Sequence, residues 1–440
     1  MSRLSPPGGH GKRGGVQTIQ AAEDDILFAK IAWRIIPFMG LLYFISFLDR
    51  VNVSFAALTM NEDLGFSNAV FGFGAGIFFL GYFLFEVPSN VILARVGARI
   101  WICRIMLTWG LVSMAMAFVW DPMSFYVMRF LLGLAEAGFA PAMIYYLTFW
   151  FPAAIRTRYM AAYFLAIPLA SVVGAPVSSL ILEMNGLGGL RGWQWLFLIE
   201  GLPACIIAFV VLFYLPDGPK VARWLNEAEK VRVAARLAAE EKPSKHKLWL
   251  ALTDMRVLAL CAVYFGIVIG LYGCTLWLPQ IVRAMGYSNL ETGFVVCGIY
   301  LVVVVVMMAV ARSSEVRGER VWHVIALALT AAAALVAAAV APSDYVVLAM
   351  LTIATAAIYA TLSPFWVIPP SFLAGAGAAA GIALINATGN LGGYVGPMMI
   401  GALRERTGAF GPGLMALAAS AVFAAAVIAI VARTVQPRHS

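Results

Sequence analysis

The apolar residues of this chain come in blocks of roughly twenty, the length that an α-helix needs to cross the hydrocarbon core of a bilayer. The blocks recur through all 440 residues, of which 62% are hydrophobic and only 12% are charged. Glycine, proline and charge clusters divide them into expected spans centred near Phe44, Phe79, Thr108, Gly138, Leu169, Cys205, Gly266, Ile299, Ala331, Ala357, Asn390 and Val422. The sequence therefore predicts an all-α integral membrane protein with twelve transmembrane helices.

The positions of the basic residues indicate the orientation in the membrane. Of the 30 Lys and Arg residues, 24 fall in the termini or in connections on one side. Cytoplasmic loops are enriched in Lys and Arg, so we expect a multi-pass protein of the cell inner membrane with both termini cytoplasmic. This asymmetry explains the net charge of +8 without a nucleic-acid partner. Residues 1–25 are polar and rich in Gly and Pro, so no cleavable signal peptide is expected.

A long charged connection divides the expected spans six and six. It reads LPDGPKVARWLNEAEKVRVAARLAAEEKPSKHKLW, and its residues 226–241 have the spacing of a short surface helix, with a solvated linker as the alternative. The predicted organisation is a disordered cytoplasmic tail (1–25), an N-terminal six-helix bundle (26–216), a cytoplasmic linker (217–248), a C-terminal six-helix bundle (249–434) and a C-terminal tail (435–440).

Two short echoes lie about half the chain apart. RVGARIW, at Arg95 to Trp101, resembles VRGERVW, at Val316 to Trp322, and VGAP in the fifth span resembles YVGP in the eleventh. Repeats at this offset predict two pseudo-symmetric bundles, an arrangement in which the substrate site forms at the midplane between them.

Charged side chains inside a membrane are rare because each costs roughly 2.5–3.5 kcal/mol at a helix centre, and they usually mark function. Four candidates occur within the expected spans: Asp49, Arg50, Arg129 and Glu136. All four belong to the first half of the chain.

Arg50, in FISFLDRVNVSF, shares a helix face with Tyr43, Ser46 and Ser54. Its guanidinium group matches a carboxylate in two parallel hydrogen bonds, so we expect Arg50 to bind an organic anion, with Tyr43 beside it. The alternative is an internal Arg–Asp pair that holds helices together. Asp49 points about 100° away around the helix, which suits either a proton-coupling carboxyl group or a simple counter-ion.

The fourth span, MRFLLGLAEAGFAPAM, places Arg129 and Glu136 two turns apart on one face. Glu136 has no charged neighbour within a turn and is a candidate proton carrier, the alternative being a neutral acid in a structural hydrogen bond. Arg129 is a candidate for binding the second carboxylate of a dianion, or else an interfacial anchor.

The second half offers neutral polar groups near prolines and glycines. Trp366 lies in SPFWVIPP, and Asn386 and Asn390 lie one turn apart in GIALINATGNLGGYVGP. The asparagines are candidates for binding substrate oxygens, or for bridging helices. Tyr82, Tyr264, Tyr272 and Trp277 either line the path or pack as membrane aromatics do.

The chain shows no nucleophile elbow, phosphate loop or HExxH motif, so we expect neither an enzyme nor an ATP-driven pump. Its five cysteines are scattered without metal-type spacing. No metal and no cofactor are expected.

Several runs together are similar to one family. They are LDRVNVSFA, VPSNVILARVGAR, RFLLGLAEAGFAPAM, GWQWLFLIEGLPA, YLPDGP followed by ARWLNEAEK, and ALINATGNLGGYVGP. Over Asp25 to Thr434 the chain resembles the anion:cation symporter family of the major facilitator superfamily, most of all its tartrate, phthalate and sugar-acid transporters. Asn90 and Ala94 depart from the superfamily signature between the second and third spans, and VGAP faintly resembles a signature of proton-driven exporters.

The resemblance implies two six-helix bundles that work by alternating access. It implies coupling and anion binding at Asp49, Arg50 and Glu136, with Arg129 at the start of the motif that contains Glu136. It also matches the family's aromatic residue of the tenth span to Trp366, its asparagine of the eleventh span to Asn390 and its substrate-facing tyrosine to Tyr82. We therefore expect a monomeric, proton-coupled symporter that imports a small organic anion: tartrate-like, an aromatic dicarboxylate or a sugar acid. The alternatives are an exporter or exchanger of the same superfamily and, from another class, a membrane sensor.

Overall fold

The computed structural model describes residues 10–152, 155, 166–238, 253–373 and 375–435. Its regular structure there is entirely helical. The first half contains α1 (His10–Asp63), α2 (Asn68–Val96), α3 (Ala98–Ala115), α4 (Pro122–Glu136), α5 (Phe139–Thr148), α7 (Ala166–Leu182) and α8 (Gly192–Tyr214). After α9 (Glu227–Ala238), the second half contains α11 (Met255–Ala284), α12 (Asn289–Arg317), α13 (Val321–Val340), α14 (Asp344–Phe365), α15 (Gly375–Thr407) and α16 (Gly411–Val435). Short 3₁₀ turns are η1 (Met116–Phe118), η2 (Leu187–Gly189), η3 (Pro219–Val221) and η4 (Pro369–Ser371).

The helices match the twelve expected spans in position. Ten helical stretches of the described residues are long and apolar enough to cross a membrane, and one of them combines α4 and α5 as Pro122–Thr148. The two remaining spans correspond to α7, with 17 described residues, and to α15, with 33. A helix therefore lies at each of the twelve positions where the sequence predicts a span, and the twelve-helix prediction is confirmed.

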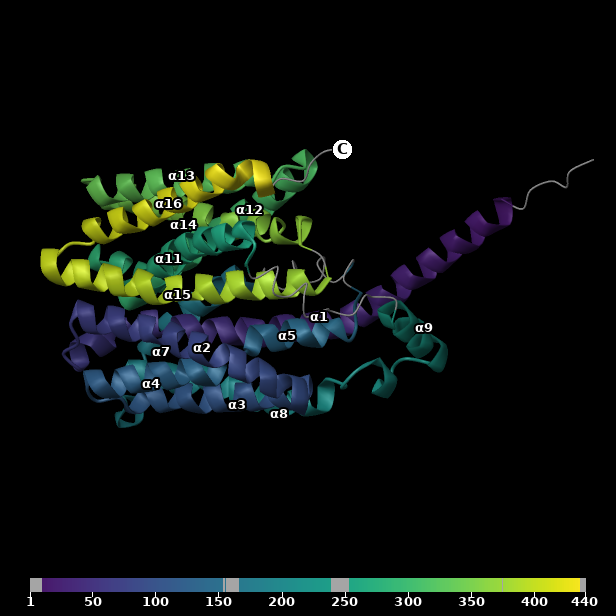
Figure 1. Cartoon of the computed structure of the whole chain (residues 1–440). Coiled ribbons are helices and arrows are strands. Elements are labelled where there is room, and N and C mark those ends of the chain that lie inside the picture. Colours follow the sequence, from purple (N-terminus) through teal and green to yellow (C-terminus); the bar gives the residue numbers. More distant parts are fainter. Residues whose placement is uncertain (1–9, 153–154, 156–165, 239–252, 374, 436–440) are drawn as a thin grey trace, which may run out of the picture.

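The helices form two layers that lie along each other (Figure 1). Helices of the first half, purple to teal, make one layer, and those of the second half, green to yellow, make the other. Within the described residues, the main contacts between the layers are those of α2 with α15, α7 with α12, and α1 with α11. Helices α1 and α2, which carry several of the functional candidates, therefore lie at the boundary between the halves.

Glycine allows the halves to approach at the end of the bundle opposite the chain termini. A Cβ atom at Gly72 of α2 would lie 2.6 Å from the carbonyl oxygen of Pro397 in α15. A Cβ at Gly293 of α12 would lie 2.7 Å from the carbonyl oxygen of Ala175 in α7. Because no side chain fits there, backbone meets backbone across the boundary.

Helix α1 begins inside the stretch 1–25 that the sequence predicts as a disordered tail. It is helical from His10 onward and extends well beyond the layers, where α9 lies against it (Figure 1). Three ion pairs join the two helices: Lys30 with Glu229 at 2.8 Å, Arg232 with Glu23 at 2.8 Å, and Arg236 with Asp24. Opposite charges on α9 thus give this extension a partner that the sequence of the tail alone does not reveal. Residues 1–9 lie outside the described residues.

Close packing of α4 on α2 generates a first testable prediction. A methyl group in Gly133→Ala would meet the Phe78 carbonyl oxygen at 2.0 Å, a separation that requires the helices to move. We expect the free energy of unfolding to fall by about 1–3 kcal/mol, measured as a lower thermal unfolding midpoint of the purified protein in detergent. Gly298→Ala in α12 is the matched control, because Gly298 is exposed and no atom lies within 4 Å of its added Cβ. Equal midpoints for the two variants would contradict the packing described.

Candidate functional site

Arg50 stands at the junction of four helices. Its Nη2 forms an ion pair with Oε1 of Glu136 in α4, and its Nη1 donates a hydrogen bond to the Tyr272 hydroxyl of α11 at 3.0 Å. Its guanidinium carbon lies 5.4 Å and 5.3 Å from the ring centroids of Phe78 and Tyr82 in α2. The Arg50 side chain is only 11% exposed, so this cation depends on the groups around it for its compensation.

Glu136 occupies the last position of α4. The helix ends there because Gly138 adopts a left-handed conformation with φ of 86°, and a Cβ at Gly138 would meet Ser89 of α2. Ser46 of α1 donates a hydrogen bond to Glu136 Oε1 at 2.9 Å, the same oxygen that pairs with Arg50. With 2% exposure, Glu136 is a buried acid whose charge faces the candidate anion-binding residue.

Asp49 faces away from Arg50 and into the first half. Its carboxylate accepts hydrogen bonds from Trp109 Nε1 at 2.8 Å, Ser113 Oγ at 2.7 Å and Asn52 Nδ2 at 3.1 Å. Among the ion pairs of the described residues, Arg50 pairs with Glu136 and not with Asp49. The adjacent acid and base therefore belong to different clusters, and the structure does not contain the Arg–Asp pair that the sequence left open.

Arg129 is completely buried between α4 and α2. Its Nε and Nη2 donate to the carbonyl oxygens of Gly74 at 3.3 Å and Ala75 at 3.2 Å. Its guanidinium carbon lies 4.9 Å from the Phe78 ring centroid, so both Arg129 and Arg50 contact that ring. The contacts of Arg129 hold two helices together, and none of them reaches the boundary with the second half.

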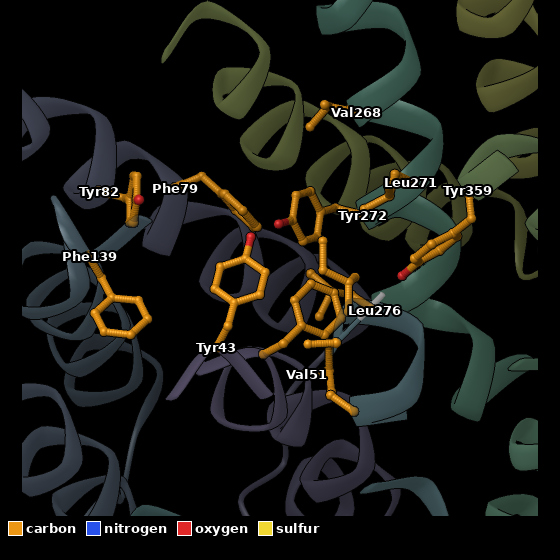
Figure 2. Packing of buried hydrophobic residues seen from close by; sticks show 14 of the residues in the cluster. Tyr43, Val51, Phe79, Tyr82, Phe139, Val268, Leu271, Tyr272, Leu276 and Tyr359 are labelled. Atoms are coloured by element: carbon orange, nitrogen blue, oxygen red, sulfur yellow. The ribbon is translucent and has the colours of Figure 1, made fainter. Parts of the chain in front are cut away.

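Aromatic side chains surround Arg50 at the boundary. Figure 2 shows Tyr43 of α1, Phe79 of α2 and Tyr272 of α11 converging, and the ring centroids of Phe79 and Tyr272 are 4.3 Å apart. Tyr82 is buried with 3% exposure and its ring faces Arg50. The structure thus places the Tyr82 ring beside Arg50, whereas the helical spacing had placed, of these two tyrosines, only Tyr43 on the face of Arg50.

The second-half candidates lie in two groups. Trp366 packs on Tyr264 with ring centroids 4.8 Å apart. Asn386 donates a hydrogen bond from Nδ2 to Oε1 of Glu86 in α2 at 3.4 Å, and Asn390 lies buried one turn further along α15. Asn386 therefore bridges the halves, whereas no described hydrogen bond or ring contact joins Trp366 or Asn390 to Arg50.

The predicted functional residues did not include three others, Tyr272, Glu86 and Glu200. The sequence offers Tyr272 only as an aromatic that lines the path or packs, yet its hydroxyl accepts a hydrogen bond from Arg50 Nη1. Glu86 in GYFLFEVPSN and Glu200 in LFLIEGLPA are buried acids within apolar runs. Glu200 accepts a hydrogen bond from Ser178 Oγ at 2.6 Å. The signal that pointed to Glu136, a lone acid in an expected span, applies equally to Glu86 and Glu200.

The described residues contain no cluster of three or more His, Cys, Asp or Glu side chains placed to hold a metal ion. All five cysteines are free thiols. The chemistry that remains is that of carboxylates, two arginines and neutral donors, which can bind an anion and exchange protons but offers no activated nucleophile.

Comparisons with known proteins assign this arrangement to a family. The family model of the Major Facilitator Superfamily matches residues 39–397. Two proteins of Agrobacterium vitis named "Putative tartrate transporter" are 53% and 52% identical over 410 residues, which cover 92% of this chain and 91% and 94% of those proteins. A "Quinolone resistance transporter" of Acinetobacter baumannii is 41% identical over 406 residues, covering 91% of this chain and 93% of that protein.

A solved structure shares the fold at low sequence identity. The crystal structure of a bacterial homologue of the human lysosomal transporter Spinster superposes with a TM-score of 0.74 at 17% identity, covering 92% of this chain and 97% of that one. Family model, relatives and fold agree: the chain belongs to the major facilitator superfamily, as a membrane transporter of the anion:cation symporter type and not as an enzyme.

Proposed function

We propose that the protein is a proton-coupled symporter that imports a small organic anion by alternating access. The substrate classes are tartrate-like acids first, then aromatic dicarboxylates and sugar acids. The observation that carries the proposal is the ion pair between Arg50 and Glu136 at the boundary between the halves. The names of the relatives from Agrobacterium vitis support the substrate class.

Arg50 is proposed to bind the substrate carboxylate. Its planar guanidinium can hold two carboxylate oxygens at once, and its present partners, Glu136 and Tyr272, come from opposite halves of the chain. A substrate that replaces them changes the contacts of both halves together. This is the kind of differential contact that an alternating-access transporter requires.

Glu136 is proposed to carry the coupled proton. An ionised Glu136 competes with the substrate for Arg50, since two like charges about 4 Å apart repel by about 4 kcal/mol at an effective dielectric constant of about 20. That repulsion corresponds to roughly a thousand-fold loss of affinity. Protonation of Glu136 removes the repulsion and frees Arg50, so anion and proton bind together.

Asp49, the other predicted coupling residue, is given a supporting role. Its three neutral donors, Trp109, Ser113 and Asn52, favour the ionised carboxylate. Its near-complete burial, without an ion-pair partner among the described residues, favours the neutral acid instead. We therefore assign the proton that competes with substrate to Glu136, and propose for Asp49 the counter-ion role, with proton coupling as its alternative.

The proposed setting is the cell inner membrane, with both termini cytoplasmic and a monomer as the working unit. The concentration of basic residues in the termini and one set of connections supports this orientation. The extension of α1 and its ion-paired partner α9 would then lie on the cytoplasmic side.

Export or exchange of an organic anion is the second candidate, favoured by the relative named as a quinolone resistance transporter. Uptake by proteoliposomes under an inward proton gradient separates the two, with labelled tartrate, phthalate, galactonate and glucarate, with and without a protonophore. Gradient-driven accumulation of one acid supports symport. Outward flux, or exchange that ignores the proton gradient, supports the alternative.

Arg50→Lys generates the sharpest prediction for anion binding. An ammonium group cannot reproduce the two parallel hydrogen bonds of a guanidinium, so we expect uptake to fall at least about ten-fold although the positive charge is kept. The measurement is the initial rate of uptake in proteoliposomes. Arg317→Lys, at an exposed position of α12, is the control and should transport normally. Normal uptake by Arg50→Lys would contradict the proposal that Arg50 binds the substrate carboxylate.

Glu136→Gln tests the coupling proton. The neutral amide mimics the protonated acid, so substrate binding and exchange of preloaded substrate should persist while proton-driven accumulation falls well below the wild-type level. Counterflow and gradient-driven uptake, measured on the same liposomes, give the two readouts. Proton-driven accumulation in Glu136→Gln at the wild-type level would show that another residue carries this proton.

A further inference from the structure

Glu86 is a buried acid at the boundary between the halves that has no counter-charge. It lies in α2 with 5% exposure, and Oε1 accepts a long hydrogen bond of 3.4 Å from Asn386 of α15. Oε2 is buried and has no hydrogen-bond partner. Buried carboxylate oxygens are normally satisfied, so an unpartnered one at a substrate boundary points to a proton or a ligand that completes it.

The position of Glu86 connects it to the anion site. It follows Tyr82 by one helical turn, and the Tyr82 ring lies 5.3 Å from the Arg50 guanidinium carbon. Arg50 acts electrostatically on Glu86, but its ion pair is with Glu136. In the described part of the chain, Glu86 forms no salt bridge of its own.

The other helices packed against α2 do not supply a counter-charge either. From α4, Glu136 pairs with Arg50, and Arg129 bonds to carbonyl oxygens. From α15, the group that reaches Glu86 is the neutral Asn386. Titratable side chains of α3 and α5 bind elsewhere: Arg99 to Asp217, Arg104 over Trp101, and Tyr146 to the Pro216 carbonyl.

A dicarboxylate carries a second negative charge, which protonation of Glu136 alone does not compensate. When Arg50 holds one carboxylate and Glu136 is protonated, the second carboxylate still lies near an ionised Glu86. The two like charges repel in a poorly hydrated site. A protonated Glu86 removes that repulsion and turns its free oxygen into a donor for the second carboxylate.

We propose that Glu86 is a second proton-carrying residue, which takes up one proton with each dicarboxylate and donates it in a hydrogen bond to the carboxylate that Arg50 does not hold. This inference rests on the proposed symport. Glu86 is protonated and neutral while the substrate-loaded transporter changes conformation, and the proton leaves Glu86 when the substrate is released. A dianion then crosses with two protons, and no net charge is moved.

The test compares wild type, Glu86→Gln and the exposed control Glu183→Gln in proteoliposomes with labelled tartrate as the dianion. The equilibrium accumulation ratio is measured against the pH gradient with the membrane potential clamped at zero, and then against the potential at fixed pH gradient. Coupling to two protons gives about a 100-fold change per pH unit and coupling to one gives about 10-fold. Counterflow exchange is measured on the same samples.

We expect wild type and Glu183→Gln to show two-proton coupling without dependence on potential. Glu86→Gln should keep counterflow, couple to one proton and become dependent on the potential, because one negative charge now crosses with each tartrate. Should Glu86→Gln fail to fold, Glu86→Asp, which keeps the acid, should retain two-proton coupling.

Several outcomes would overturn the inference. One-proton coupling in wild type, two-proton coupling in Glu86→Gln, or loss of counterflow in a folded Glu86→Gln each contradict it while leaving proton symport intact. One-proton coupling in Glu86→Asp contradicts it as well. Failure of wild type to accumulate tartrate under any proton gradient is a different result, because it refutes the proposed function itself.

Discussion

The site depends on one ion pair, Arg50 with Glu136, held among apolar helices. Removal of one partner from a buried pair costs on the order of 3–5 kcal/mol, because the other charge is left uncompensated. In the proposed mechanism, an anion that enters replaces Glu136 at Arg50 and is not simply added beside it. The proposal links anion binding to protonation, because a protonated Glu136 no longer competes for the guanidinium group.

The surrounding helices position Arg50 and Glu136 for this interaction. Helix α4 ends at Glu136 because Gly138 takes a left-handed conformation, and Gly133 lets α4 approach α2 closely enough for Arg129 to bond to its carbonyl oxygens. Tyr272 then brings the second half of the chain to Arg50. A change of hydrogen-bond partners at Arg50 therefore changes the contacts of both halves, as transport by alternating access requires.

The sequence alone predicted much of this arrangement. Apolar blocks of membrane-spanning length predicted the helices, and charges within them predicted Arg50 and Glu136. The cost of burial applies equally to Glu86 and Glu200, two acids within apolar runs that were not among the predicted candidates. Arg129 was a candidate for binding a second carboxylate, and its contacts with backbone carbonyls could be seen only in three dimensions. Helical spacing shows which residues share a helix face but not which other helix packs against that face. The sequence therefore could not assign Asp49 and Arg50 to separate clusters.

Proton uptake on substrate binding tests the central claim most directly. Purified wild-type protein in weakly buffered detergent solution near neutral pH is mixed with tartrate, and the pH change is followed with an indicator dye while binding is measured in parallel. Competition between substrate and Glu136 for Arg50 predicts that protons are taken up from solution as tartrate binds, and that uptake saturates with binding. Saturable tartrate binding without proton uptake would contradict the account, because the anion would then occupy its site while Glu136 stays ionised.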